Sequence, residues 1–255
     1  MTPQSCENDE EDLWDPPAAT ILAPGIPGLH FDPQVLLDQS YADELVRSTF
    51  PYFQGGSNQV MLFGRAASPD GELPGGLPIF VSELITRLAT LLRDRLPPST
   101  YQLIFPSLPS EHIYPARQVI LNLYRPGEGI TPHVDLLQRF GDGIVGVSLL
   151  SGIVMTLTPA SSPELPDNEE APIHHHIYLP ARSIIVLEKE ARYQWKHGIP
   201  ARKLDFIESD VSGNLWRDRE TRISITIRWL LPDADLVGGD GPQCEELVGD
   251  SCKLR

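Results

Sequence analysis

The sequence predicts an α+β fold that is mainly β, with supporting helices near the N-terminus and a β-sandwich after them. Its 255 residues, of which 41% are hydrophobic, suffice for one sizeable core. The apolar residues are spaced as in amphipathic helices up to Pro98 and form short β-rich runs after it. Two helices followed by about seven strands fit a double-stranded β-helix, or jelly-roll, core with the helices on one side.

Two helices are expected in the N-terminal part. After a short strand at 28–31, residues 32–50 have helical spacing, with Asp32 as the N-cap and Pro33 at the first helical position. A second helix lies within 78–96, and two prolines follow it. Its apolar face is formed by Val81, Leu84, Ile85, Leu88, Leu91 and Leu92.

Short β-rich segments make up the rest of the predicted domain. Each is rich in β-branched or aromatic residues, and turn residues separate one from the next. A turn at Ser151-Gly152 divides the second segment into two strands, and a turn at 180–182 separates the third from the fourth. The expected segments are 117–124, 143–158, 174–179, 183–188, 194–199 and 221–231.

The formal net charge of −15 is concentrated in three segments. Residues 1–16, 159–172 and 232–255 carry −6, −4 and −4, and they are rich in Pro, Ser and Gly, as tails and loops are. We therefore expect one domain at 28–231, with 159–172 as a surface insert. We expect an acidic disordered tail at 1–27 and an acidic C-terminal tail at 232–255. The near-neutral remainder neither indicates nor excludes a nucleic-acid partner.

The cysteines and the hydropathy indicate the compartment. Cys6, Cys244 and Cys252 lie near the two ends at spacings that fit no zinc motif, so we expect free thiols in the reducing cytoplasm or nucleus. The chain contains no run of ~18 apolar residues and its acidic start lacks a secretory signal, so no membrane association is expected. We expect it to act as a monomer.

The segment GITPHVD, residues 129–135, places His133 and Asp135 two residues apart. Side chains at this spacing point the same way from an extended backbone. The pair is common by chance, so a metal site requires a third ligand from elsewhere, for which His197 in YQWKHGIP is the best candidate. Two histidines and one carboxylate leave metal positions open for a cosubstrate and dioxygen, as in non-haem Fe(II) sites.

The last expected strand, RISITIR, has two faces of opposite character. Isoleucines form one face, and the other is formed by Arg222, Ser224, Thr226 and Arg228. Arginines on an inward face suit a carboxylate ligand in a dry pocket. The same pattern also fits a solvent-facing edge strand, and the sequence alone does not decide between these two interpretations.

Asn122 and Tyr124 share one face of the strand that leads into GITPHVD, where each can donate a hydrogen bond to a small ligand or to protein groups. N-x-Y, H-x-D, a distant His and R-x-x-x-x-x-R then form an ordered set. With it, residues 28–231 resemble the AlkB-like Fe(II)/2-oxoglutarate dioxygenases. NLYRPGEGITPHVD and DGIVGVSLLSGIVM are close to the eukaryotic branch that includes the tRNA-modifying homologues.

The resemblance implies a role for each of these residues. Fe(II) would be held by His133, Asp135 and His197. The 2-oxoglutarate residues would be Asn122, Tyr124, Arg222 and Arg228, the last of them nearer the metal and the substrate. With dioxygen as cosubstrate, the family usually oxidises a methyl group on a nucleobase nitrogen of RNA or DNA.

The substrate residues are expected in NQVMLFGR, which occupies the place of the family's nucleotide lid. Met61, Phe63 and Arg65 are candidates to stack on or contact a base, and the alternative, which residue type slightly favours, is a strand that packs Met61 and Phe63 inward. Two other functions are kept open: the same iron chemistry on a protein or lipid-linked substrate, and an interaction module without catalysis.

Overall fold

The computed structural model describes residues 17–64, 76–106, 116–161, 174–209, 213–232 and 234. Several expectations lie outside these residues: the acidic segment 1–16, Arg65, most of the 159–172 insert, the tail from 235 on, and the three cysteines.

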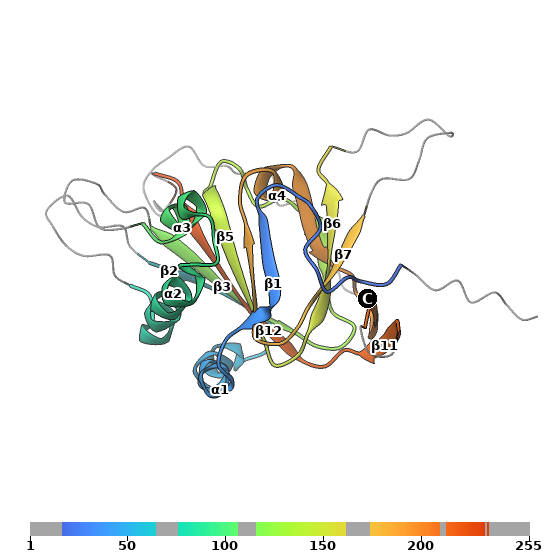
Figure 1. The fold of residues 1–255 in the computed structure, drawn as a ribbon. Coiled ribbons are helices and arrows are strands. Elements are labelled where there is room, and N and C mark those ends of the chain that lie inside the picture. Colours follow the sequence, from blue (N-terminus) through green and yellow to red (C-terminus); the bar gives the residue numbers. More distant parts are fainter. Residues whose placement is uncertain are drawn as a thin grey trace, which may run out of the picture.

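Two antiparallel sheets face each other in a sandwich (Figure 1). The larger sheet has the order β1 (Leu29–Leu36), β8 (Ser183–Leu187), β5 (Phe140–Leu149), β12 (Arg222–Leu230), β3 (Arg117–Tyr124) and β2 (Gln59–Phe63). The smaller has β4 (Ile130–His133), β9 (Trp195–Ile199), β6 (Ile153–Pro159) and β7 (His175–Leu179). A hairpin of β10 (Leu204–Ile207) and β11 (Leu215–Asp218) stands beside them.

The predicted turns carry the chain from one sheet to the other. The turn at Ser151-Gly152 joins β5 of the large sheet to β6 of the small one, and the turn at 180–182 joins β7 back to β8. Consecutive strands therefore alternate between the sheets in this region, as they do in a jelly roll. The expected double-stranded β-helix core is confirmed.

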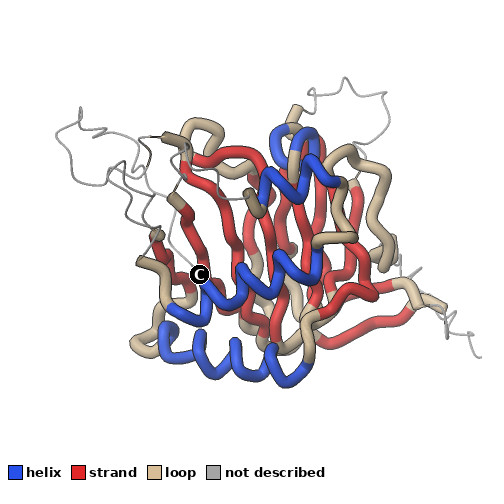
Figure 2. The backbone as a smooth tube through the Cα atoms, turned by 60° about the vertical axis from the view of Figure 1, so that its left-hand side comes forward, coloured by secondary structure: helices blue, strands red, loops and turns tan. Residues whose placement is uncertain are grey.

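Helices cover one face of the large sheet (Figure 2). They are α1 (Gln39–Thr49), the short 3-10 helix η1 (Phe50–Phe53), α2 (Ile79–Leu92) and α3 (Pro98–Ile104), while α4 (Lys189–Tyr193) precedes β9. The predicted face of α2 is buried in the main core against β3, β5 and β12. Within the described residues, no helix is long and apolar enough to cross a membrane.

The first helix begins later than the sequence predicted. Asp38 is its N-cap, and its carboxylate accepts hydrogen bonds from the main-chain N–H groups of Ser40 and Tyr41. Asp32, the expected cap, lies in β1 and accepts from Gln34 N instead. The prediction was wrong because β1 pairs with β8 along the sheet edge, and this tertiary pairing overrides the local helical spacing.

The fold also begins earlier than expected. Ala19 is completely buried and forms a bridge with Ile207, and Thr20 forms one with Ile177. Ala19 therefore contacts the hairpin and Thr20 the smaller sheet. The expected tail at 1–27 thus extended too far towards the domain.

The packing of α2 generates a stability prediction. Leu84 is completely buried between α2 and the sheet, whereas Ile79 of the same helix is 78% exposed. Leu84→Ala should lower the free energy of unfolding by about 2–5 kcal/mol, because it leaves a cavity in the core. The control Ile79→Ala should change it by less than about 0.5 kcal/mol. Urea unfolding measures both, and equal effects would contradict the packing described.

Candidate active site

A cavity of about 400 Å³ lies between the two sheets. Its walls come from β12 and β3 of the large sheet and from β4 and β9 of the small one. Of the residues predicted for the site, the cavity is lined by Met61, Asn122, Tyr124, His133, Asp135, His197, Arg222 and Arg228. Residues that are far apart in the sequence are thus brought to one place.

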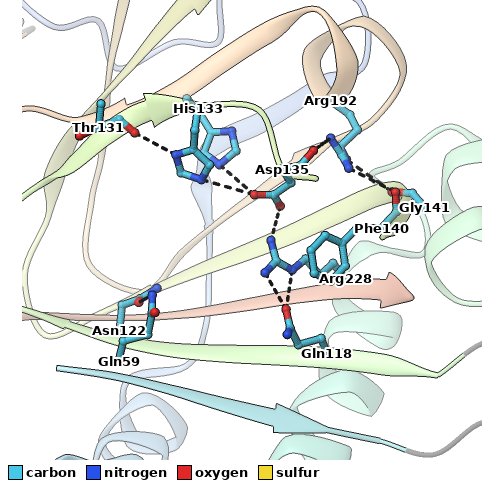
Figure 3. Close-up of polar contacts among 11 residues, drawn as sticks. Gln59, Gln118, Asn122, Thr131, His133, Asp135, Phe140, Gly141, Arg192 and Arg228 are labelled. Carbon is cyan, nitrogen blue, oxygen red and sulfur yellow. Dashed lines mark hydrogen bonds and ion pairs between the residues drawn. The ribbon is translucent and has the colours of Figure 1, made fainter. Parts of the chain in front are cut away.

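The predicted metal ligands meet at this cavity. Antiparallel pairing of β4 with β9 places His133 directly opposite His197, and their ring centroids are 4.6 Å apart. Asp135 Oδ1 lies 3.4 Å from His133 Nε2 and 4.0 Å from His197 Nε2 (Figure 3). One ligand atom from each residue lies within 4.8 Å of the others, so a single ion can contact all three.

Two of the three residues, His197 and Asp135, are held in the protonation states that a metal ligand needs. The hydrogen bond with Asp135 raises the pKa of His133, whose Nδ1 donates to Thr131 O at 2.9 Å and leaves Nε2 towards Asp135. Burial lowers the pKa of His197 to about 4, so its imidazole is neutral at pH 7. Burial would raise the pKa of Asp135, but His133, Arg228 and His197 together hold it well below its usual range. This donor set fits Fe(II).

Two glycines let β4 approach β9 this closely. A Cβ on Gly198 would lie 2.8 Å from Pro132 Cα, and a Cβ on Gly129 would lie 2.2 Å from Ile199 O. Both distances are shorter than van der Waals contact, so a side chain at either position would push the strands apart. The glycines that flank the two histidine positions therefore help to set the distance between them.

The polar face of β12 forms the opposite wall of the cavity. Ile223, Ile225 and Ile227 lie in the main core, whereas the cavity is lined by Arg222, Ser224, Thr226 and Arg228. The strand lies between β5 and β3 in the middle of the large sheet. The interpretation as a solvent-facing edge strand is therefore wrong, and the inward-facing arginines remain to be explained.

Arg222 fits an anionic ligand. It is 4% exposed, and Nε and Nη2 donate to Ser148 Oγ at 3.2 and 2.9 Å. Its buried Nη1 has no hydrogen-bond partner among the described residues. Burial lowers the pKa of Arg222 to about 10, so the guanidinium still carries its charge at pH 7. A buried donor of this kind suits a carboxylate that enters from the cavity.

Arg228 lies at the metal end of the cavity. Its Nη1 is 2.7 Å from Asp135 Oδ2, and Nε and Nη2 donate to Gln118 Oε1 at 2.9 and 2.6 Å. The guanidinium carbon lies 3.6 Å from the centre of the Phe140 ring (Figure 3). Arg228 thus has a carboxylate, an amide and a ring as protein partners, whereas Nη1 of Arg222 has no hydrogen-bond partner among the described residues.

The strand expected to contact the substrate is present as β2, and the structure shows which of its two faces packs against the core. Met61 and Phe63 are 50% and 40% exposed, while Val60 and Leu62 pack against the core, so inward packing of Met61 and Phe63 is wrong. Met61 lines the cavity. Gln59 of the same strand also lines it and donates to Asn122 Oδ1 at 2.8 Å.

Three residues that hold the site were missed in the sequence. Gln118 engages Arg228, Ser148 engages Arg222, and Arg192 donates to the main-chain carbonyl of Asp135 at 3.1 Å. Gln118 carried a usable signal, because it shares the period-2 face of Asn122 and Tyr124. Ser148 and Arg192 carried none, since only the fold brings them to their partners.

A jelly roll with a His-x-Asp and distant His site beside a buried arginine is typical of Fe(II)/2-oxoglutarate oxygenases. Residues 78–228 match the family model described as "2OG-Fe(II) oxygenase superfamily", and the chain belongs to this superfamily. Its cofactors are accordingly Fe(II) and 2-oxoglutarate.

Known relatives agree with this family. The chain is 43% identical over 116 residues to an uncharacterised protein of Acanthamoeba polyphaga mimivirus (46% of this chain, 49% of the relative). It is 32% identical over 170 residues to Xenopus tropicalis tRNA (carboxymethyluridine(34)-5-O)-methyltransferase alkbh8 (62% and 23%). It is 32% identical over 119 residues to the Arabidopsis thaliana alkylated DNA repair protein ALKBH8 homolog (44% and 33%). The chain matches less than half the length of each relative, and the AlkB-like resemblance is confirmed.

The close approach of β4 and β9 generates a prediction for metal binding. Gly198→Ala should weaken Mn(II) binding by roughly ten- to hundred-fold, because the added methyl group displaces β4 and with it His133. Isothermal titration calorimetry measures the affinity. Gly25→Ala is the control, since a Cβ there meets no atom within 4 Å. Unchanged affinity in Gly198→Ala would show that strand spacing does not limit the site.

Proposed function

We propose that the protein is an Fe(II)/2-oxoglutarate-dependent dioxygenase that oxidises a C–H bond of a modified nucleobase in RNA or DNA. The observation that carries the proposal is one cavity that holds both His133, Asp135 and His197 and the free, buried Nη1 of Arg222. A metal triad and an unpaired cation in one cavity suit a metal-chelating dicarboxylate.

Different residues would bind the metal and the far carboxylate of 2-oxoglutarate, at two ends of the cavity. His133, Asp135 and His197 would hold Fe(II), which with 2-oxoglutarate and dioxygen supplies the oxidising chemistry. Arg222 would pair with the far carboxylate of 2-oxoglutarate, with Tyr124 and Asn122 beside it on the cavity wall. The burial of Arg222 strengthens such a pair, because little water competes for its donor.

Two observations support a nucleobase as the substrate. Two of the three relatives named above have names that refer to tRNA carboxymethyluridine and to the repair of alkylated DNA. The exposed residues that line the cavity, Gln59, Met61 and Leu136, are uncharged, and the latter two are apolar, which suits the flat face of a base.

The same uncharged rim motivates a second candidate, a protein substrate for the same chemistry. Among the described residues, those that line the cavity and are exposed include no Lys or Arg to neutralise a phosphate. We prefer a nucleobase substrate because two relatives have names that refer to tRNA or DNA. The uncharged residues at the cavity mouth do not indicate any particular peptide.

Succinate formation tests the proposed reaction. The wild-type protein with Fe(II), 2-oxoglutarate and oxygen should release succinate on RNA and DNA oligonucleotides that carry methylated bases. His133→Ala should reduce release to background, because it removes a metal ligand. Methyl-lysine peptides are assayed in parallel: turnover on peptides alone would favour the second candidate, and equal turnover by both proteins would exclude the assigned metal site.

The cosubstrate assignment predicts a separate effect. Arg222→Gln should raise the KM for 2-oxoglutarate by roughly ten- to hundred-fold, because a charge-assisted hydrogen bond to a buried carboxylate is lost. Arg95→Gln is the control, since Arg95 is an exposed residue paired with Asp32 at 3.8 Å outside the cavity. A KM unchanged by Arg222→Gln would place the far carboxylate elsewhere.

A further inference from the structure

Arg192 is a buried cation for which the proposed reaction has no direct use. It lies in α4 with 1% of its surface exposed. Its guanidinium donates to three main-chain carbonyls of the turn after β4 and the start of β5: Asp135 O at 3.1 Å, Phe140 O at 3.3 Å and Gly141 O at 3.4 Å (Figure 3). A buried guanidinium is costly unless its donors are satisfied, so these contacts strongly favour one geometry of the turn.

The segment 135–141, which is a turn that runs into the start of β5, carries two groups of the site. Asp135 supplies the carboxylate of the metal triad, and the Phe140 ring covers the guanidinium of Arg228. Main-chain hydrogen bonds from Arg139 N and Phe140 N to Leu136 O close the turn. Because the turn is closed in this way, a shift of the carbonyls that Arg192 binds would move the Asp135 carboxylate with them.

Arg192 also lies in the same segment of the chain as His197, the third proposed metal ligand. His197 follows it by five residues, and α4 leads directly into β9. The helix is itself held in place, since Ala191 N donates to Pro27 O at 3.0 Å. The contact from Arg192 to Asp135 O therefore ties the His197 segment to the Asp135 segment without passing through a metal.

We infer that Arg192 is a positioning residue that sets the distance between Asp135 and His197 before the metal binds. This inference rests on the proposed function. The contact of Arg192 with Asp135 O is the second connection between the segments that carry the three ligands, after the pairing of β4 with β9. The pairing of β4 with β9 fixes His133 relative to His197, and Arg192 fixes Asp135 relative to both. A preorganised site of this kind binds a metal more tightly because less conformational freedom is lost on binding.

Co(II) binding by the full chain, without 2-oxoglutarate or substrate, tests this inference. The visible d–d absorption of Co(II) reports both its affinity and the geometry of its ligands. Arg192→Met should raise the Kd for Co(II) by roughly ten- to hundred-fold and change the spectrum at saturation. Arg192→Lys should be intermediate, because one ammonium group cannot reach three carbonyls at once.

Arg182→Met is the matched control, because Arg182 also donates to a main-chain carbonyl, Leu37 O at 2.8 Å, but away from the cavity. Its Kd and spectrum should equal those of the wild type. Wild-type binding by Arg192→Met, or an equal loss in Arg182→Met, would overturn the inference. If Arg192→Met does not fold by circular dichroism, Arg192→Lys decides, and wild-type affinity there would overturn it. Failure of the wild type to bind Co(II) would instead refute the proposed function.

Discussion

The antiparallel pairing of β4 with β9 is the constraint on which the rest of the site depends. It sets two histidines from distant parts of the chain directly opposite each other. The pairing is possible at this spacing because Gly129 and Gly198 bring no side chain between the strands. Asp135 follows His133 by two residues, just beyond the end of β4, and its carboxylate completes a group of three possible metal ligands.

The charges around this centre are arranged asymmetrically. Asp135 faces two imidazoles and Arg228, so its charge is already balanced by protein groups. Arg222, at another part of the same cavity wall, has hydrogen bonds to Ser148 but no carboxylate partner among the described residues. In a medium of low dielectric constant, the cavity is therefore most complementary to an anion near Arg222. At the other end, the ligand atoms of His133, Asp135 and His197 suit a metal ion because they converge within 4.8 Å of one another. A metal ion together with a dicarboxylate meets both requirements.

Local patterns predicted most of the strands and the composition of their faces. The alternation in β12 correctly separated the isoleucines of the core from the arginines of the cavity, because side-chain direction in a strand follows directly from sequence parity. Parity alone does not say which face of a strand is buried, and for this reason Met61 and Phe63 could not be placed. The start of α1 was wrong because β1 gains more from pairing with β8 than residues 33–36 gain from a helix.

The sequence by itself determined the class of the fold and the division of β12 into an apolar and a polar face, since both rest on residue type and short-range spacing. It also named His133, Asp135 and His197 as candidate metal ligands, but through the order of several motifs along the chain. The tertiary structure decided which groups support them. Gln118 on Arg228, Ser148 on Arg222 and Arg192 on Asp135 O are contacts between segments far apart in the chain. Such contacts leave no periodic trace in a sequence, because they depend on how two sheets and a short helix are placed in space.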